Sequence, residues 1–163
     1  MKLLNFGSLN IDYVYDMPHF VQGGETATAT ARHVYAGGKG LNQSIAAARA
    51  GAQVLHAGAI GPDGAFLTQL LQDAGADTSA LLQVQEASGH AMIQVTPEGQ
   101  NAIIVYGGAN HCLTEAYVQS VLRQAEPGDL VLLQNETSQT AQIIAQAADL
   151  GLRVVFNPSP FPA

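Results

Sequence analysis

Three glycines and a lysine lie in the stretch AGGKGLN, residues 36–42, directly before an alanine-rich run that is typical of a helix. Glycines at a helix start leave backbone N–H groups bare, and the helix dipole favours an anionic or oxygen-rich ligand there. Asn42 follows in the first turn, and its amide both donates and accepts hydrogen bonds, as a polyhydroxylated ligand requires. The stretch therefore predicts a ligand site that would suit a sugar. For Lys39, a solvated side chain at a helix start is the simpler alternative.

Nucleotide-binding motifs do not fit the same stretch. A Walker A motif needs a glycine five positions before its Gly-Lys pair and Ser or Thr after it, where this chain has His33 and Gly40. A dinucleotide fingerprint would place GxGxxG directly after the first strand, where the chain reads GSLNID. The glycines are therefore not explained by either phosphate-binding loop.

Further polar residues stand where strands are expected to end. Asn10 and Asp12 follow the first strand, and Glu136 follows another in LVLLQNE. Ligands of open α/β sheets bind outside the carboxyl ends of the strands, and carboxylates form strong hydrogen bonds with hydroxyl groups. These three residues, with Lys39 and Asn42, are predicted to line one cleft. The alternatives are a turn formed by Asn10 and Asp12, and a favourable helix-dipole interaction for Glu136.

Other reactive residues are interpreted as structural. Asn110, in GGANHCLT, precedes Thr114 and an amphipathic run, a pattern that favours a loop and a helix N-cap over a ligand contact. The five histidines lack metal-binding spacing, and the single Cys112 has no evident base beside it. An internal disulfide is excluded, and a structural zinc site is not expected.

The rest of the chain alternates strand and helix patterns. Buried strands are predicted at residues 3–8, 53–60, 129–134 and 153–157, and helices at 39–50, 63–75, 114–126 and 138–151. This rhythm implies a parallel sheet covered by helices on both faces. The chain stops soon after a buried strand with no closing helix, which predicts one half of a longer α/β protein.

Two segments depart from that rhythm. Residues 26–35 alternate threonine with alanine, and residues 89–106 form two alternating runs about a Pro-Glu-Gly-Gln turn. Their polar alternation predicts a small separate sheet, spanning approximately residues 12–35 and 89–106, that lies over one end of the main sheet.

Composition narrows the possible partners. The net charge is −7 with only six lysines and arginines, which argues against nucleic-acid binding. No apolar run approaches the roughly 20 residues that span a bilayer, so no membrane association is expected. The N-terminus MKLLNFGSLNID meets glycine, asparagine and aspartate too early for a signal peptide, which favours a cytoplasmic location.

The order of the motifs resembles one known family. GSLNID, GGETATA, AGGKGLNQSIAAARAGAQV, GAIGPDGAF, GGAN and LLQNE succeed one another as in the ribokinase-like (PfkB) carbohydrate kinases, over nearly the whole chain. The GGKGxNQ stretch followed by the alanine-rich helix is the specific part of this likeness. The resemblance implies a three-layer α/β domain with a parallel sheet and a small β-sheet lid over the sugar, through which two subunits often pair as a homodimer.

The resemblance also assigns roles to individual residues. It implies that Asn10 and Asp12 hold sugar hydroxyl groups and that Glu136 closes the site. The remaining implied sugar contacts are Gly38, Lys39 and Asn42 from GGKGLN, and Ala91 and Ile93 as apolar contacts from the lid.

One part of the family pattern does not occur. The second half of these kinases supplies a GAGD segment, whose aspartate accepts the hydroxyl proton, together with the sites for ATP, Mg²⁺ and a monovalent cation such as K⁺. No GAGD occurs here, so the resemblance implies sugar recognition without a catalytic residue, and a chain that is inactive alone. Asn135, where the family commonly has an apolar residue, makes the placement of Glu136 less specific.

Two alternatives remain open. One is a kinase of the same fold for a nucleoside or a phosphorylated sugar, although a phosphosugar would be expected to need more cations than Lys39. The other is a non-catalytic sugar-binding module that is complete at this length.

Overall fold

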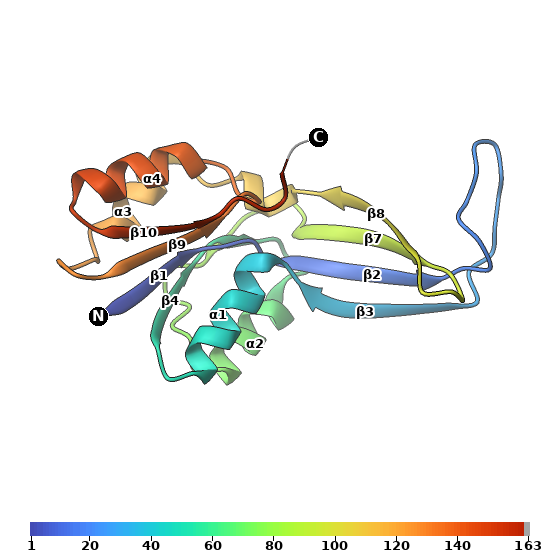
Figure 1. Cartoon of the computed structure of the whole chain (residues 1–163), viewed down its shortest axis with the longest axis horizontal. Helices are drawn as coiled ribbons and strands as arrows, with labels where there is room; N and C mark the ends of the chain where they lie inside the picture. Colours follow the sequence, from blue (N-terminus) through green and yellow to red (C-terminus); the bar gives the residue numbers. More distant parts are fainter. Residues whose placement is uncertain (162–163) are drawn as a thin grey trace.

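The computed structural model describes residues 1–161 and contains the predicted three layers (Figure 1). Four parallel strands form the main sheet in the order β10–β9–β1–β4: Arg153–Asn157, Leu130–Gln134, Lys2–Phe6 and Gln53–Ala57. Helices α1 (Lys39–Arg49) and α2 (Ala65–Asp73) lie on one face of this sheet. Helices α3 (Glu115–Leu122) and α4 (Thr140–Asp149) lie on the other.

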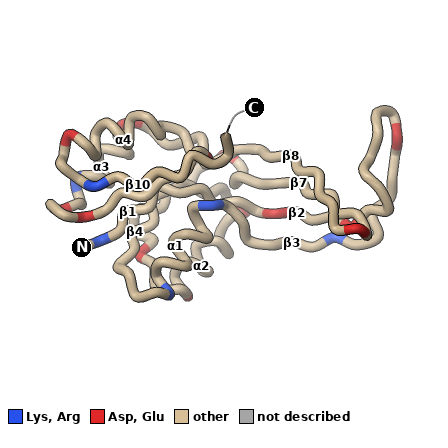
Figure 2. Tube along the Cα trace, viewed as in Figure 1, with Lys and Arg blue, Asp and Glu red and all other residues tan. Residues whose placement is uncertain are grey.

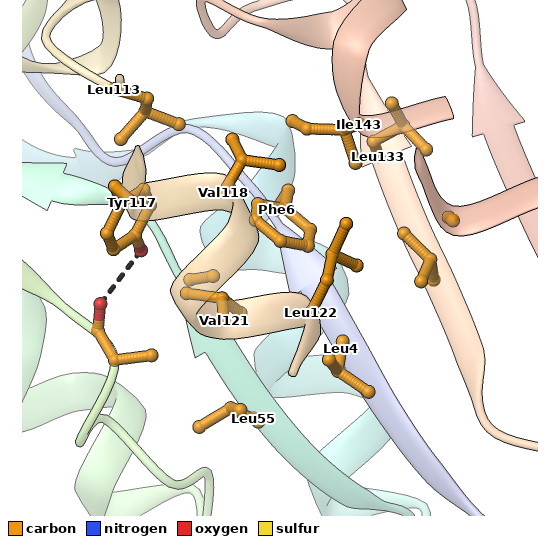
Figure 3. Close-up of a cluster of buried hydrophobic side chains, with 14 of the residues drawn as sticks. Leu4, Phe6, Leu55, Leu113, Tyr117, Val118, Val121, Leu122, Leu133 and Ile143 are labelled. Atoms are coloured by element: carbon orange, nitrogen blue, oxygen red, sulfur yellow. Dashed lines mark hydrogen bonds between the residues drawn. The ribbon is translucent and has the colours of Figure 1, made fainter. Parts of the chain in front are cut away.

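Alternate side chains of the buried strands pack into two separate cores. Leu4 and Phe6 of β1 point toward α3 and α4, where they meet Val118 and Ile143 (Figure 3). On the opposite face Val54 of β4 belongs to the cluster formed with helices α1 and α2. The runs of apolar residues in β1 and β4 are therefore explained by burial on both faces. The prediction that 153–157 is buried was wrong, because β10 lies at the edge of the sheet and leaves Val155 and Phe156 50% and 40% exposed.

Helix ends follow the predicted signals. Helix α1 ends before Gly51 and α2 before Gly75, which adopt φ angles of 90° and 88°. Glycine reaches this left-handed conformation without the steric cost that a side chain imposes. At the start of α3 the backbone N–H of Tyr117 donates to Thr114 Oγ1 at 3.2 Å, which confirms the predicted N-cap.

A second sheet projects from the carboxyl ends of the main strands (Figure 1). Its order is β3–β2–β7–β8: Ala31–Gly37, Asn10–Asp16, Gly89–Val95 and Asn101–Tyr106. Strands β7 and β8 pair in antiparallel fashion, which confirms the predicted hairpin. We refer to this sheet as the lid sheet.

Two strand predictions were wrong in extent. Residues 26–30 lie outside any strand, because β2 ends at Asp16 and the pairing with β3 begins only at Ala31. The segment 53–60 is broken at Gly58. Beyond it, β5 (Ala59–Ile60) pairs with β6 (Leu82–Gln83) in a separate two-stranded sheet.

Charged side chains are sparse on this fold. Lysines and arginines are few along the described trace, and some lie near one another at the end of the molecule that holds α3 and the N-terminus (Figure 2). No helix within residues 1–161 is both long and apolar enough to cross a membrane.

Candidate substrate-binding site

A pocket of about 270 Å³ lies where the main sheet meets the lid sheet. Polar groups reach it from the start of β2, the start of α1, the short 3₁₀ helix η1 (Gly108–His111) and the segment after β9. Its lining residues are Asn10, Lys39, Val105, Gly107, Asn110, His111, Asn135, Glu136 and Pro160. Three of the predicted site residues therefore line one pocket at the carboxyl ends of the strands.

Glu136 is held at the start of α1. Its Oε1 accepts from the Lys39 ammonium at 2.7 Å, and its Oε2 accepts from the backbone N–H of Lys39 at 3.0 Å. The Ser8 hydroxyl donates to the same Oε2 and accepts from the backbone N–H of Gly40 at 3.2 Å. The Glu136 side chain is only 15% exposed, so these contacts fix one orientation of its carboxylate.

This arrangement corrects one expectation about the glycine stretch. The N–H groups at the start of α1 are not bare, because those of Lys39 and Gly40 donate to Glu136 and Ser8, and that of Leu41 donates to the Ser8 carbonyl. The anionic group that the helix start favours is a carboxylate of the same chain. A ligand would therefore meet side chains here rather than free backbone donors.

The room left by glycine is taken by backbone. A methyl group at Gly40 would lie 2.3 Å from the Cα of Gly7, and one at Gly38 would lie 2.7 Å from the Ser8 carbonyl oxygen. Only glycine permits α1 to begin in direct contact with the turn that joins β1 to β2. The same contact places Ser8 beside the helix start, a role that was not predicted for this residue.

Asn110 contributes more than the loop role expected of it. It is 2% exposed within η1 and lines the pocket. Its Nδ2 donates to Asn10 Oδ1 at 2.7 Å, and its Oδ1 accepts from the backbone N–H of Leu9 at 3.0 Å. Because Asn10 Oδ1 accepts this bond, the Asn10 amide nitrogen is the group that can donate to a ligand. The GGAN motif was the available signal, but it was interpreted as a loop that precedes a helix N-cap.

Asp12 lies one pleat farther along β2, on the same face as Asn10. It is half-buried against Gly37, where a methyl group would come within 2.3 Å of Asp12 Oδ2. Burial raises the pKa of the Asp12 carboxyl above its ordinary value, and the negative charge of Glu136 raises this pKa further. Contrary to the prediction, Asp12 does not line the pocket, but its carboxylate lies close enough to Glu136 for the two charges to interact.

The remaining predicted residues are arranged around this centre. Ala91 is the register partner of Asp12, and Ile93 is the register partner of Val14, so both face the same side of the lid sheet as Asp12. Asn42 is exposed in the first turn of α1 and does not line the pocket. Direct contacts of all these residues with a sugar remain predictions.

Comparison with known proteins identifies the class. Residues 1–161 match the model of the pfkB family of carbohydrate kinases, and the chain belongs to this family. It is 39% identical over 159 residues to the ribokinase of Haemophilus influenzae, a match that covers 94% of this chain and 52% of the relative.

Solved structures give the same result. The crystal structure of ribokinase from Cryptococcus neoformans in complex with ADP superposes with a TM-score of 0.84 at 38% identity, covering 99% of this chain and 50% of that one. Arabidopsis thaliana ribokinase complexed with ribose and ATP superposes with a TM-score of 0.79 at 27% identity, covering 97% and 53%. The chain thus spans about half the length of the relatives that it matches.

Proposed function

We propose that this chain is the sugar-binding part of an ATP-dependent ribokinase, which converts D-ribose to D-ribose 5-phosphate. The observation that carries the proposal is that Asn10, Lys39 and Glu136 line one pocket at the junction of the two sheets, with the Asp12 carboxylate close enough for the charge of Glu136 to raise its pKa. The similarity to proteins named ribokinase supports ribose as the sugar.

The chemistry of the site suits hydroxyl groups. The ionised Asp12 carboxylate accepts hydrogen bonds from sugar hydroxyls, and the Asn10 amide nitrogen donates to them. Lys39 and Glu136, already paired, present a donor and an acceptor side by side. In this proposal the apolar side chains of Ala91 and Ile93 cover the sugar from the lid sheet and limit its contact with water.

A phosphorylated substrate fits this pocket less well. Lys39 is the only lysine or arginine among the residues that line the pocket, and its charge is offset by Glu136 at 2.7 Å. Asp12 adds a second carboxylate nearby. A phosphate group would meet net negative charge here, so an unphosphorylated sugar is favoured over a phosphosugar.

The same charges do not fit a nucleotide triphosphate with its Mg²⁺. We therefore derive no step through ATP, Mg²⁺ or K⁺ from this pocket and propose that residues outside this chain bind them. In this proposal the chain alone binds the sugar and transfers no phosphoryl group. Sugar-dependent ATP turnover by the purified chain would contradict this part of the proposal.

The lid sheet is also proposed to pair two subunits. Ile104 and Val105 on its outer strand β8 are 67% and 65% exposed, Met92 is exposed on the adjacent strand β7, and Val34 is exposed on β3 at the opposite edge of the sheet. A strand with so much exposed apolar surface is typical of an interaction site. We propose a homodimer formed through this sheet.

Thermal-shift titration of the chain with ribose, fructose 1-phosphate and adenosine tests the sugar proposal. Ribose at a 100-fold excess over its dissociation constant should add about 2.7 kcal/mol of stability. Fructose 1-phosphate and adenosine should add much less. Stabilisation by adenosine or the phosphosugar alone would contradict ribose as the substrate.

A further inference from the structure

A polar layer is buried beneath the candidate site, on the face of the main sheet that α1 covers. Asn5 of β1, Ser44 of α1, His56 of β4 and Gln134 of β9 are each 0% exposed. The adjacent part of this face is apolar, with Leu41 and Val54 in its core. Burying four polar side chains among apolar ones is costly unless they are hydrogen-bonded to one another.

The four side chains form one connected path. Gln134 Nε2 donates to Asn5 Oδ1 at 2.9 Å, and Asn5 Nδ2 donates to Ser44 Oγ at 2.7 Å. Ser44 Oγ lies 2.7 Å from His56 Nδ1, and His56 Nε2 lies 3.2 Å from the Gly7 carbonyl oxygen. Asn5 Nδ2 also donates to the Gly40 carbonyl oxygen at 2.9 Å.

The partners assign the protons along this path. A carbonyl oxygen only accepts, so His56 must carry its proton on Nε2 to bond Gly7. Its Nδ1 then accepts from the Ser44 hydroxyl, which itself accepts from Asn5. Burial lowers the pKa of His56 from 6.5 to about 4, which agrees with a neutral ring.

The path also donates hydrogen bonds to two backbone carbonyls beside the site, those of Gly7 and Gly40. Gly7 and Gly40 are in the close contact described above. Ser8 follows Gly7 and Lys39 precedes Gly40, and both side chains donate hydrogen bonds to the Glu136 carboxylate. Gln134 stands two residues before Glu136 on the third segment that reaches the site.

We propose that His56 is a positioning residue for substrate binding. Its Nε2–H holds the Gly7 carbonyl and thereby sets Ser8 against the start of α1, in the orientation in which Ser8 and Lys39 fix Glu136. Ser44 supports this arrangement through its hydrogen bond to His56, and Asn5 supports it through its hydrogen bond to the Gly40 carbonyl. This inference rests on the proposed function, because the ligand whose affinity it governs is the sugar.

Two substitutions of His56 separate the two hydrogen bonds of its ring. The amide nitrogen of glutamine in His56→Gln reaches the Nε2 position and can still donate to Gly7. The amide of asparagine in His56→Asn ends at the Nδ1 position, so it can accept from Ser44 but leaves the Gly7 carbonyl without a donor. Each variant loses one buried hydrogen bond, so their losses of stability should be similar.

Isothermal titration with ribose should then distinguish the variants. We expect His56→Asn to raise the ribose dissociation constant about tenfold and His56→Gln to raise it less than about threefold. Tyr117→Phe is the matched control, because it removes a buried hydrogen bond to the Ala80 carbonyl on the opposite face of the sheet. It should lower the melting temperature without changing ribose affinity.

The outcomes distinguish the positioning role of His56 from the proposed function of the chain in sugar binding. Equal ribose affinity in both His56 variants would overturn the positioning role while leaving the proposed function in place. Failure of the wild-type chain to bind ribose would overturn the proposed function and this inference together.

A spectroscopic measurement on the wild-type chain covers the case in which His56→Asn does not fold. The ¹⁵N resonances of the His56 ring should report the neutral Nε2–H form, and they should shift when ribose is added. An Nδ1–H form, or ring resonances that ribose leaves unchanged, would overturn the inference.

Discussion

Lys39 donates two hydrogen bonds to the Glu136 carboxylate. Its backbone N–H donates to Oε2 at 3.0 Å, and its ammonium donates to Oε1 at 2.7 Å. The two residues are 97 positions apart in the sequence. A carboxylate that accepts from a helix start and from an ammonium at once is favoured by the helix dipole and by the ion pair. Glu136 therefore joins the segment after β9 to the start of α1, and any ligand of the pocket binds beside this junction.

Replacing Glu136 by glutamine should weaken both folding and sugar binding. Glu136→Gln leaves the Lys39 ammonium half-buried without its anionic partner, which should lower the free energy of unfolding by about 1–3 kcal/mol. The ribose dissociation constant should rise as well, because Lys39 is then free to turn away from the pocket. Urea denaturation and calorimetric titration measure the two effects. Glu98→Gln, at the exposed hairpin turn, is the control and should change neither.

Asp12 should control the pH dependence of sugar binding. Its pKa is raised by burial and by Glu136, so its carboxylate takes up a proton at a higher pH than an ordinary aspartate does. Protonation removes acceptors for sugar hydroxyls, so ribose affinity should fall as the pH is lowered through this raised pKa. Calorimetry at a series of pH values, from neutral down toward the ordinary pKa of an aspartate, would show the decrease.

Two variants test the assignment to Asp12. Asp12→Ala should abolish most ribose affinity while leaving the far-UV circular dichroism spectrum unchanged. Asp12→Asn should bind weakly at every pH. Retention of the pH dependence in Asp12→Asn would show that another group is responsible.

If the lid sheet forms the dimer interface, substitutions of its exposed apolar side chains should dissociate the dimer. Ile103 and Ile104 are exposed neighbours on β8, so their side chains point to opposite faces of the sheet. At least one of the single variants Ile103→Lys and Ile104→Lys should dissociate the dimer, and the result identifies the face that pairs. Light scattering across a concentration series measures the mass. Gln100→Lys, in the hairpin turn, serves as the control; a monomeric wild type would refute the dimer.

The layered fold was predictable because each element carries its own signal. The strand–helix rhythm predicted the parallel sheet, and the Pro-Glu-Gly-Gln turn predicted the lid hairpin, which the structure has at 89–95 and 101–106. Residues 26–30 were assigned to a strand by their alternation alone. Alternation cannot show whether a partner strand is present, and β2 has already ended at Asp16.

The site was predictable only in part, for a similar reason. Asn10 and Glu136 were identified because they follow buried strands, a position that sequence alone indicates. The roles of Ser8 and Asn110 depend on hydrogen bonds to residues about one hundred or more positions away. The glycines indicated a close approach, but sequence could not show that backbone, rather than a ligand, makes it.

Gly40→Ala should test the close contact at the start of α1. In an ordinary helix this change stabilises by roughly 0.5–1 kcal/mol, since alanine has the higher helix propensity. Here the new methyl group would lie 2.3 Å from Gly7 Cα and from Ser8 N, so we expect destabilisation by about 3 kcal/mol. Gly23→Ala is the control, because a methyl group there meets nothing within 4 Å. Equal melting temperatures for the two variants would contradict the contact.

His56 should make the stability of the fold depend on pH in a defined window. Its pKa is lowered by burial to about 4 in the folded chain, against 6.5 as the ordinary value. Between these values the unfolded chain binds the proton and the folded chain does not, so stability rises with pH across this window. The full contribution is present above pH 6.5 and is lost as the pH falls toward 4, a difference of about 3 kcal/mol.

The increase of stability with pH can be assigned to His56 by comparison with a variant whose residue 56 cannot titrate. His56→Gln keeps the donor to the Gly7 carbonyl, so it should fold while lacking this part of the pH dependence. The difference between the wild-type and variant unfolding free energies, measured by urea denaturation at each pH, cancels the contributions of the acidic residues that both share. That difference should grow by about 3 kcal/mol from pH 4 to pH 7, because only the wild type gains stability as His56 in its unfolded chain loses the proton. A constant difference would mean that His56 takes up its proton at the same pH in the folded and unfolded chains, and burial would then not lower its pKa.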